Sequence, residues 1–406
     1  MRCSCVHDKR PWMIASIRAA FAGSGSRVFL LWVSLALCAA PLSQRAAAAP
    51  VVTGYVFPQG RQIAPGDVDA GKLTRINYAF ARIQDGRIVE GFPSDAVNLA
   101  QITALRRQNP GLAVLISVGG WSWSDGFSDV ARTVQNRKVF VESVIDFLRR
   151  YQLDGLDVDW EYPGQAGAGH PFRSADKQNF TRLLKDLRVR FSQEEMKSHH
   201  RLYLTIAAGA SQDYLEHTEM TRAQRYVDAV NLMTYDYYGP ASDPVTGNHS
   251  PLMTDPADPK AVSADASVRA FMAAGVPAGK IVLGIPFYGR MWSDVPDVQH
   301  GLFQPGKPAA TGDLPFSTVR TMLVGPGVTR FWDAAAQVPY LYNPQTREFV
   351  SYEDAESAAA KCRYAVRHGL QGVMFWSYFN DPSRELLGAI TEALTGASAL
   401  PAQHGY

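Results

Sequence analysis

Residues 154–162 read DGLDVDWEY and place four carboxylates within eight residues of otherwise apolar, strand-like sequence. Side chains on a β-strand alternate between its two faces, so Asp157, Asp159 and Glu161 are predicted to share one face. Carboxylates of like charge held this close cannot all ionise freely, and at least one is expected to have a raised pKa and to hold a proton near neutral pH. A protonated carboxyl group is what a general acid needs. Asp154 lies off this face, and we expect it to be a structural hydrogen-bond acceptor.

The residues alone leave three interpretations of this acidic segment open. Its carboxylates can be a catalytic array, a site for a hard cation, or a structural hydrogen-bond network. The apolar neighbours Leu153, Leu156 and Val158 argue against a solvated acidic face. Calcium loops use glycine-bearing turns with several carbonyl ligands rather than a strand, so the catalytic array is the interpretation that we favour.

Candidate strands alternate with helical patterns along the remainder of the chain. Amphipathic stretches such as 135–151 and 176–191 fall between several of the strands. Eight strands in this rhythm predict an α/β fold with a parallel sheet closed into a (β/α)8 TIM barrel, which suits the length of the chain. An open doubly wound sheet is the alternative, but no GxGxxG pattern follows the first strand. The predicted strands are Val52–Phe57, Arg75–Ala81, Leu112–Val118, Gly155–Tyr162, Leu202–Ala208, Ala229–Tyr235, Ile281–Phe287 and Gly372–Tyr378.

The rhythm is interrupted once, over residues 292–351. That stretch is rich in Gly and Pro, contains β-like pieces, and is too long for an ordinary βα loop. We interpret it as a small α+β insertion between strand 7 and helix 7 of the barrel, because its aromatic residues favour a packed unit. The barrel would then comprise residues 50–291 and 352–396, and residues 397–406 would form a C-terminal tail.

Residues 1–49 have the pattern of a secretory leader. Arg27 precedes an apolar run at 28–40, and the small residues 46–49 come just before Pro50, which predicts cleavage near Ala49. The apolar run is too short to span a bilayer comfortably. We therefore expect a secreted protein, extracellular or periplasmic, whose mature form has no membrane association.

Charge and cysteine content narrow the functions that the mature chain can have. Six of the 40 Lys and Arg residues and one of the 38 Asp and Glu residues lie within 1–49, so the remainder has a net charge of −3. No basic patch is left to suggest nucleic acid or a membrane surface as a partner, and we expect a monomer. Cys362 is the one cysteine outside the leader, and its helical surroundings predict a buried, inert thiol.

The predicted carboxyl ends of the barrel strands, where the chemistry of this fold takes place, are unusually aromatic. A single aromatic residue at a strand end is ordinarily part of the core. Aromatic residues at nearly every strand end, interleaved with Asp and Arg, indicate a saccharide cleft, because sugar rings stack on aromatic planes and their hydroxyl groups need polar partners. The residues concerned include Tyr55, Tyr78, Phe80, Trp121, Tyr235, Tyr238, Phe287, Tyr288 and Trp376.

Taken together, the motifs at these strand ends resemble glycoside hydrolase family 18, the chitinases and their relatives. The pattern DxxDxDxE at residues 154–161 is that family's signature. The resemblance covers about residues 55–396 and implies a chitinase fold with an α+β insertion. One position departs from the pattern, since Ser377 follows the strand-8 Trp where many members have Glu. The other matching segments, in order, are Ser-x-Gly-Gly at 117–120, Met-x-Tyr-Asp at 233–236, Tyr-Gly-Arg at 288–290 and Trp376.

The resemblance also implies roles for individual residues. Glu161 would protonate the glycosidic oxygen, and no side chain would be the nucleophile, because these enzymes use the 2-acetamido oxygen of the substrate. Asp159 would accept a hydrogen bond from the acetamido N–H and stabilise an oxazolinium intermediate, and Asp157 would share a proton with Asp159. Tyr235 would position the acetamido carbonyl, and Asp236 would contact the distorted sugar. No metal or cofactor is implied. The residues implied to bind chitin and chitooligosaccharides are Tyr55, Phe80, Gly120, Trp121, Met233, Tyr288, Arg290 and Trp376.

Three other functions remain as alternatives. A lectin on the same scaffold would bind chitin without cutting it, but such relatives typically lose the acid, and Glu161 is present here. An endo-β-N-acetylglucosaminidase acting on glycoproteins or peptidoglycan would share the same catalytic core. A metal-dependent hydrolase is disfavoured, because His170, His217 and His249 lack the spacing of metal ligands.

Overall fold

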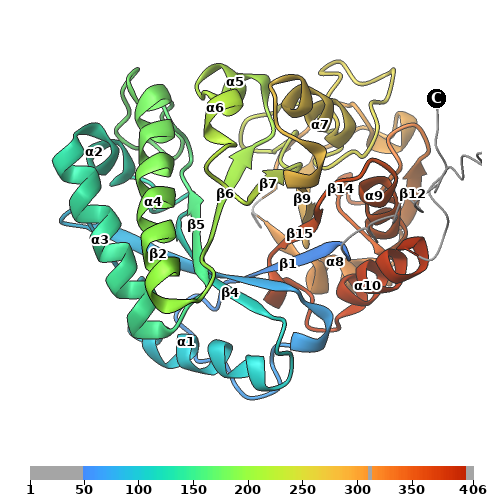
Figure 1. Cartoon of the computed structure of the whole chain (residues 1–406). Helices are drawn as coiled ribbons and strands as arrows, with labels where there is room; N and C mark the ends of the chain where they lie inside the picture. The colour runs from blue at the N-terminus through green and yellow to red at the C-terminus, as the bar shows by residue number, and fades with distance from the viewer. Residues whose placement is uncertain (1–48, 310–312, 399–406) are drawn as a thin grey trace, which may run out of the picture. The chain divides into compact units, whose positions relative to one another are not determined.

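A closed barrel of parallel strands is the central feature of the computed structural model, which describes residues 49–309 and 313–398. The barrel strands in these residues are β1 (Val51–Val56), β2 (Arg75–Gln84), β4 (Ala113–Gly119), β5 (Gly155–Asp159), β6 (Tyr203–Gly209), β7 (Ala229–Met233), β8 (Ile281–Pro286) and β15 (Gly372–Trp376). They pair around the barrel in the order β1, β15, β8, β7, β6, β5, β4 and β2, and β2 returns to β1 (Figure 1). This confirms the predicted (β/α)8 barrel. A short strand, β3 (Arg87–Val89), pairs antiparallel with the end of β2.

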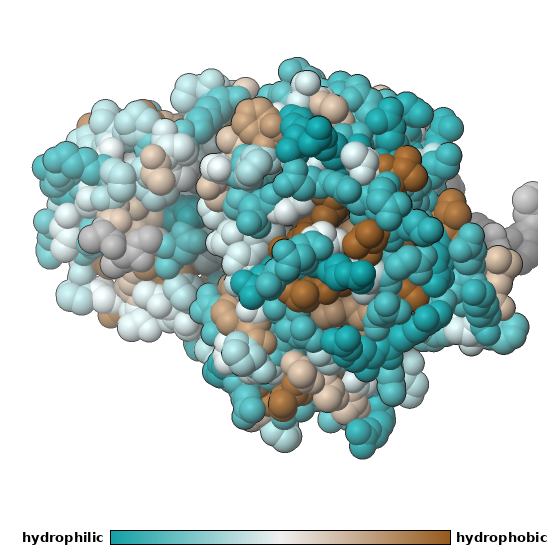
Figure 2. All heavy atoms as spheres, turned by 90° about the vertical axis from the view of Figure 1, so that its left-hand side faces the viewer, coloured by the Kyte–Doolittle hydropathy of each residue, from teal (hydrophilic) through white to brown (hydrophobic). Residues whose placement is uncertain are grey.

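Helices surround the barrel (Figure 1), and their buried apolar side chains form one core with those of the strands. On β5, Leu156 and Val158 are fully buried in this outer layer, and Phe140 and Val144 of the preceding helix belong to the same core. Figure 2 shows an outer side of the molecule that is largely hydrophilic with separate apolar patches, as expected when the apolar stripe of each helix faces the barrel. The helices are α1 (Asp95–Ala104), α2 (Phe127–Arg132), α3 (Val134–Tyr151), α4 (Asp176–Ser198), α5 (Gln212–Glu216), α6 (Met220–Ala223), α7 (Ala264–Ala273), α8 (Phe316–Met322), α9 (Ala355–Arg367) and α10 (Glu385–Ser398).

A second, antiparallel sheet follows barrel strand β8. Its strands are β9 (Tyr288–Ser293), β10 (Lys307–Pro308), β11 (Leu314–Pro315), β12 (Thr329–Asp333), β13 (Val338–Asn343) and β14 (Glu348–Ser351). They pair in the order β10, β9, β14, β13 and β12, and β11 also pairs with β9. The first of them begins two residues after β8, so the predicted boundary of the insertion at residue 292 falls inside β9.

Three barrel strands end two or three residues earlier than predicted. The predicted strands 155–162, 229–235 and 372–378 end in the structure at Asp159, Met233 and Trp376. Beyond these points the backbone groups bond to side chains and turns rather than to a neighbouring strand. The N–H of Glu161, for example, donates to Ser124 Oγ at 2.9 Å. Glu161 and Tyr235 therefore lie in the loops at the barrel mouth and not on the strands themselves.

Several predictions concern the ends of the chain and its cysteines. The predicted leader, apart from Ala49, and most of the predicted tail lie outside the described residues. None of the described helices has the length and apolar character needed to cross a bilayer. Cys362 is buried in α9, where burial raises the pKa of its thiol to about 12. The prediction of a buried thiol is thus confirmed, and its high pKa makes the reactive thiolate scarce.

Trp292 should be a principal contributor to the stability of the second sheet. Its side chain is fully buried, packs edge-on against Phe349 at a ring distance of 5.9 Å, and donates to the carbonyl of Asp243 at 3.0 Å. We expect Trp292→Ala to lower the free energy of unfolding by about 3–5 kcal/mol, measured by urea denaturation, because it leaves a large cavity. Val324→Ala, at a side chain that is 86% exposed, is the control and should change it by less than about 0.5 kcal/mol. A loss below about 1 kcal/mol for the Trp292 variant would contradict this assignment.

Candidate active site

The interior of the barrel holds Asp157 in a cage of hydrogen-bond donors. Tyr55 Oη and Ser117 Oγ donate to its Oδ2 at 2.9 and 2.8 Å. Thr205 Oγ1 and Asn231 Nδ2 donate to its Oδ1 at 2.5 and 3.0 Å. Burial raises the pKa of Asp157, and these hydrogen bonds oppose that effect because they favour the charged form. The cage therefore favours Asp157 as a carboxylate that does not itself react.

Asp159 lies one interior position further along β5 and has a different environment. Its side chain is buried, and its Oδ1 has no hydrogen-bond partner among the described residues. Burial, together with the nearby charges of Glu161 and Asp157, raises the pKa of Asp159 well above its usual range. The predicted proton shared with Asp157 does not appear as a hydrogen bond in the described part of the chain, because the oxygens of Asp157 already accept from other donors. Asp159 is thus left available for a substrate group.

Glu161 lies just beyond the end of β5 and is held by the loop that follows β4. Its N–H donates to Ser124 Oγ, and Ser124 in turn donates to the carbonyl of Asp159 at 3.1 Å. Burial, with a smaller contribution from the charge of Asp236, raises the pKa of Glu161 to about 7. Half of these carboxyl groups would therefore be protonated near neutral pH, as the sequence predicted for a general acid.

The two glycines at the end of β4, Gly119 and Gly120, allow the chain there to approach the acidic segment closely. Gly119 has φ +104°, and a Cβ there would come within 2.3 Å of the carbonyl oxygen of Asp159. The N–H of Gly120 donates to that same oxygen at 2.8 Å, and a Cβ at Gly120 would meet the ring of Phe80 at 2.6 Å. The structure therefore assigns Gly120, which we predicted to bind substrate, the task of fixing the backbone at Asp159.

Asp236 lies at the barrel mouth and is paired with residues from the second sheet. Tyr288 Oη donates to it at 2.8 Å, and Arg290 donates through Nε at 2.8 Å and Nη2 at 2.7 Å. The ring of His249 lies behind it, with Nδ1 3.7 Å from Asp236 Oδ1. Burial would raise the pKa of Asp236, but His249 and the charge of Arg290 outweigh it and hold the pKa below its usual range. Asp236 is therefore ionised at neutral pH.

Aromatic rings form one wall of the site around Trp376, which is partly exposed at the end of β15. Trp376 stacks on Phe80 and Phe57 with ring distances of 5.3 and 5.4 Å, and the ring of Tyr55 meets its edge at 5.9 Å. Tyr55 and Phe80 are themselves buried. These two residues, which we predicted to bind substrate, thus support Trp376 from behind, and Trp376 presents the open aromatic surface.

The other predicted binding residues are distributed around the same mouth. Tyr235 is partly exposed and its ring meets that of Tyr288 edge-on at 6.1 Å, while Met233 packs in the same interior cluster. Trp121 is 54% exposed on the loop after β4, and its carbonyl oxygen is 2.7 Å from Nε2 of His170. The mouth therefore combines carboxyl groups, a tyrosine hydroxyl and exposed indole surfaces.

Sequence reasoning missed several residues that build the site. We predicted no role for Ser124, although its hydroxyl connects the loop that follows β4 to Glu161. Phe57, Phe92 and Trp123 form a row of rings that extends from Trp376, with Phe57–Phe92 and Phe92–Trp123 distances of 6.3 and 5.2 Å. All three rings are partly exposed. The available signal was their position, with Phe57 at the end of a predicted strand and Phe92 and Trp123 in the segments that follow the next two predicted strands.

Comparison with known proteins identifies the family to which this arrangement belongs. Residues 51–381 match the family model described as Glycosyl hydrolases family 18. The chain belongs to glycosyl hydrolase family 18. Chitinase A1 of Niallia circulans is 35% identical over 89% of this chain, although this chain spans only 61% of that protein.

Solved structures of family 18 proteins agree with the fold. Chitinase ChiW from Paenibacillus sp. str. FPU-7 superposes with a TM-score of 0.80 and 39% identity over 86% of this chain, which covers 33% of ChiW. A family 18 N-acetylglucosaminidase from Paenibacillus barengoltzii superposes with a TM-score of 0.79 and 41% identity, over 85% of this chain and 99% of that one. The barrel is therefore that of glycosyl hydrolase family 18.

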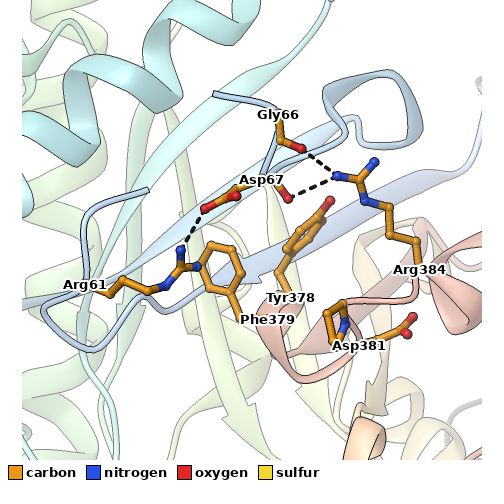
Figure 3. A pocket seen from close by; sticks show the side chains of 8 residues that line it. Arg61, Gly66, Asp67, Tyr378, Phe379, Asp381 and Arg384 are labelled. Atoms are coloured by element: carbon orange, nitrogen blue, oxygen red, sulfur yellow. Dashed lines mark hydrogen bonds and ion pairs between the residues drawn. The ribbon is translucent and has the colours of Figure 1, made fainter. Parts of the chain in front are cut away.

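A metal centre and a surface hollow are two other possible sites in this family 18 chain. In residues 49–309 and 313–398, no cluster of three or more His, Cys, Asp or Glu side chains could hold a metal ion. A hollow of about 400 Å³ lies between the loops that follow β1 and β15 (Figure 3). Its charged groups bind one another, since Arg61 donates to Asp67 at 2.7 Å and Arg384 to the carbonyl of Gly66 at 2.6 Å. The barrel mouth therefore remains the candidate active site.

The buried acid should reduce the stability of the folded chain above neutral pH. The pKa of Glu161 rises from 4.5 to about 7 on folding, so the folded state binds the proton more tightly and loses stability as the pH rises through this window. Glu161→Gln removes this loss. We expect the variant to be more stable than the wild type by of the order of 3 kcal/mol at pH 8, with little difference at pH 4, measured by urea denaturation.

Glu392→Gln is the control for this prediction, because Glu392 is exposed on α10. It should change the free energy of unfolding by less than about 0.5 kcal/mol, as expected for an exposed surface position. If Glu161→Gln gave the same stability difference at pH 4 and pH 8, Glu161 could not be the buried, destabilised carboxyl group described above.

Proposed function

We propose that this chain is a secreted chitinase that hydrolyses β-1,4 linkages between N-acetylglucosamine units by a retaining, substrate-assisted mechanism. One observation carries the mechanistic part. Asp157 is occupied by its donor cage, Asp236 is paired with Arg290 and Tyr288, and Asp159 is buried with a raised pKa. None of these described carboxyl groups is a free nucleophile beside Glu161. A nucleophile supplied by the substrate resolves this difficulty.

Glu161 and Asp159 both act in the first step, in which the glycosidic bond breaks. The charge of Glu161 adds to burial in raising the pKa of Asp159, and burial raises the pKa of Glu161 to about 7, so the two carboxyl groups compete for a proton. With the proton on Glu161, the acid can protonate the leaving glycosidic oxygen. Asp159 is then charged, accepts the acetamido N–H through its unpartnered oxygen, and offsets the positive charge of the oxazolinium ring.

The second step reverses the proton movement. Glu161, now a carboxylate, takes a proton from water as that water attacks the anomeric carbon and opens the oxazolinium ring. Tyr235 is available to hydrogen-bond the acetamido carbonyl and keep it in line with that carbon. Because two displacements occur at the same carbon, the product retains its configuration.

The shape and chemistry of the mouth favour a chitin chain as the substrate. Trp376 offers a partly exposed indole plane beside the acids, and Trp121 and the Phe57–Phe92–Trp123 row offer further ring faces. Stacked sugar rings suit such surfaces. The names Chitinase A1 and Chitinase ChiW support this substrate class. The N-acetylglucosaminidase at 41% identity makes release of single sugars the second candidate.

We also propose where the protein acts and what its oligomeric state is. The apolar run at 28–40, followed by small residues up to Ala49, supports secretion. The net charge of −3 beyond residue 49 supports action on an uncharged polymer rather than on nucleic acid. We propose that the mature protein acts as a monomer.

Removal of the acid should abolish hydrolysis and leave binding largely intact. We expect Glu161→Gln to lower kcat on chitin hexamer by at least about 10²–10⁴-fold, while calorimetric binding of the hexamer persists. In the wild type, kcat should fall as the pH rises through about 7, because the acid then loses its proton. A variant that keeps more than about a hundredth of the wild-type kcat would show that the acid is assigned wrongly. A wild type that binds the hexamer without cutting it would favour the lectin.

The substrate's acetamide should be indispensable. Cellulose is expected to be inert, fully deacetylated chitosan nearly so, and hydrolysis of chitin hexamer should yield the β-anomer first, as followed by NMR. Asp159→Asn should slow the reaction strongly, since a neutral amide cannot offset the charge of the ring. Initial formation of the α-anomer would instead require direct attack by water. Exclusive release of monomeric sugar from the hexamer would select the N-acetylglucosaminidase activity.

A further inference from the structure

The catalytic residues after β7 lie where the regular strand has ended. β7 stops at Met233, and Asp236 has φ +61°, which is uncommon for a residue other than glycine. Neighbouring strands therefore do not explain why Tyr235 and Asp236 keep their positions. The support must come from side chains that bond to this short segment.

Thr234 is the first anchor of the segment. Its hydroxyl donates to the carbonyl of Gly284 on β8 at 2.8 Å and accepts from the N–H of Gly284 at 3.0 Å. Its own carbonyl oxygen accepts from Ser250 Oγ at 2.7 Å. Thr234 directly precedes Tyr235, so Ser250 acts on the peptide unit that carries the catalytic tyrosine.

A fully buried ion pair holds Ser250. Lys361 Nζ donates to the Ser250 carbonyl at 2.7 Å and to its Oγ at 2.6 Å, and its remaining hydrogen-bond donor goes to Glu353. Glu353 also accepts from Ser357 Oγ at 2.7 Å. Both charged side chains are 0% exposed. The chain of bonds thus runs from Glu353 through Lys361 and Ser250 to the carbonyl of Thr234.

The adjacent residue extends this support to Asp236. His249, directly before Ser250, is fully buried, and its ring lies against Asp236 and at 5.3 Å from the ring of Tyr288. Its carbonyl accepts from the N–H of Tyr237 at 3.1 Å. Its N–H donates to Ser351 Oγ of β14 at 2.8 Å. The dipeptide 249–250 therefore contacts both ends of the segment that contains Tyr235 and Asp236.

Stability alone gives a weak reason for such a buried pair. Removing two charges from water is costly, and apolar side chains of similar volume are often as stabilising as the pair. Lys361 uses two of its three donors on Ser250 and not on its counter-ion. From this geometry we infer that Lys361 is a positioning residue, which acts through Ser250 to fix Tyr235 and Asp236 for catalysis. This inference rests on the proposed function of those two residues.

Two changes test it on the full chain. Ser250→Ala removes the bond to the Thr234 carbonyl, and the double variant Lys361→Met/Glu353→Gln removes both charges without stranding one of them. We expect each to lower kcat on chitin hexamer by about tenfold or more, because small misplacements of reacting groups are costly, with KM changed by less than threefold. Hydrogen exchange followed by mass spectrometry should be faster for the amides of residues 234–239.

Tyr364→Phe is the matched control. Tyr364 lies on α9 like Lys361, and its buried hydroxyl donates to Asp265 of α7 at 2.9 Å rather than to residues 234–239 or to Ser250. It should leave both kcat and the exchange of residues 234–239 unchanged. The inference is overturned if Ser250→Ala and the double variant remain folded with kcat within twofold of wild type and unchanged exchange. A wild type inactive on the hexamer would refute the proposed function, while the exchange comparison would still decide the structural link.

Discussion

The hydrogen bonds to Asp157 are the constraint on which the rest of the site depends. Their donors come from β1, β4, β6 and β7, so one carboxylate at the centre of the barrel connects strands from most of its circumference. A buried charge without such partners would be very costly. Its position in turn fixes that of Asp159 two residues later. The electrostatic properties of the mouth therefore depend on Asp157, which is not expected to contact the reacting atoms.

The pKa values at the mouth follow from how partners are distributed among neighbouring carboxyl groups. Asp236 has a cationic partner in Arg290 and is held in its charged form, whereas burial raises the pKa of both Asp159 and Glu161, and the charge of Glu161 raises that of Asp159 further. The carboxyl groups at the mouth are thus of two kinds. Asp236 is ionised, whereas Asp159 and Glu161 compete for a proton. This division is what acid catalysis with a charged stabiliser requires.

The sequence could predict the barrel and the acids because both depend on local patterns. The alternation of strands and helices and the spacing of Asp157, Asp159 and Glu161 are visible in the chain itself. The ends of β5, β7 and β15 were predicted too far along, and at β5 a hydrogen bond to the distant residue Ser124 replaces the ladder. Likewise, Tyr55 was expected to contact substrate, and nothing local reveals that its hydroxyl is used by Asp157.

The second sheet supplies residues that support the candidate active site. β9 supplies Tyr288 and Arg290 to Asp236, and β14, which pairs with β9, supplies the hydroxyl that holds His249. The helix that follows the sheet supplies Lys361. The ionised state of Asp236 and the backbone after β7 both depend on residues that begin two positions after β8. A loss of activity on removing this sheet would therefore report lost electrostatic support for Asp236 as well as lost support for the backbone after β7, and only single substitutions can separate the two.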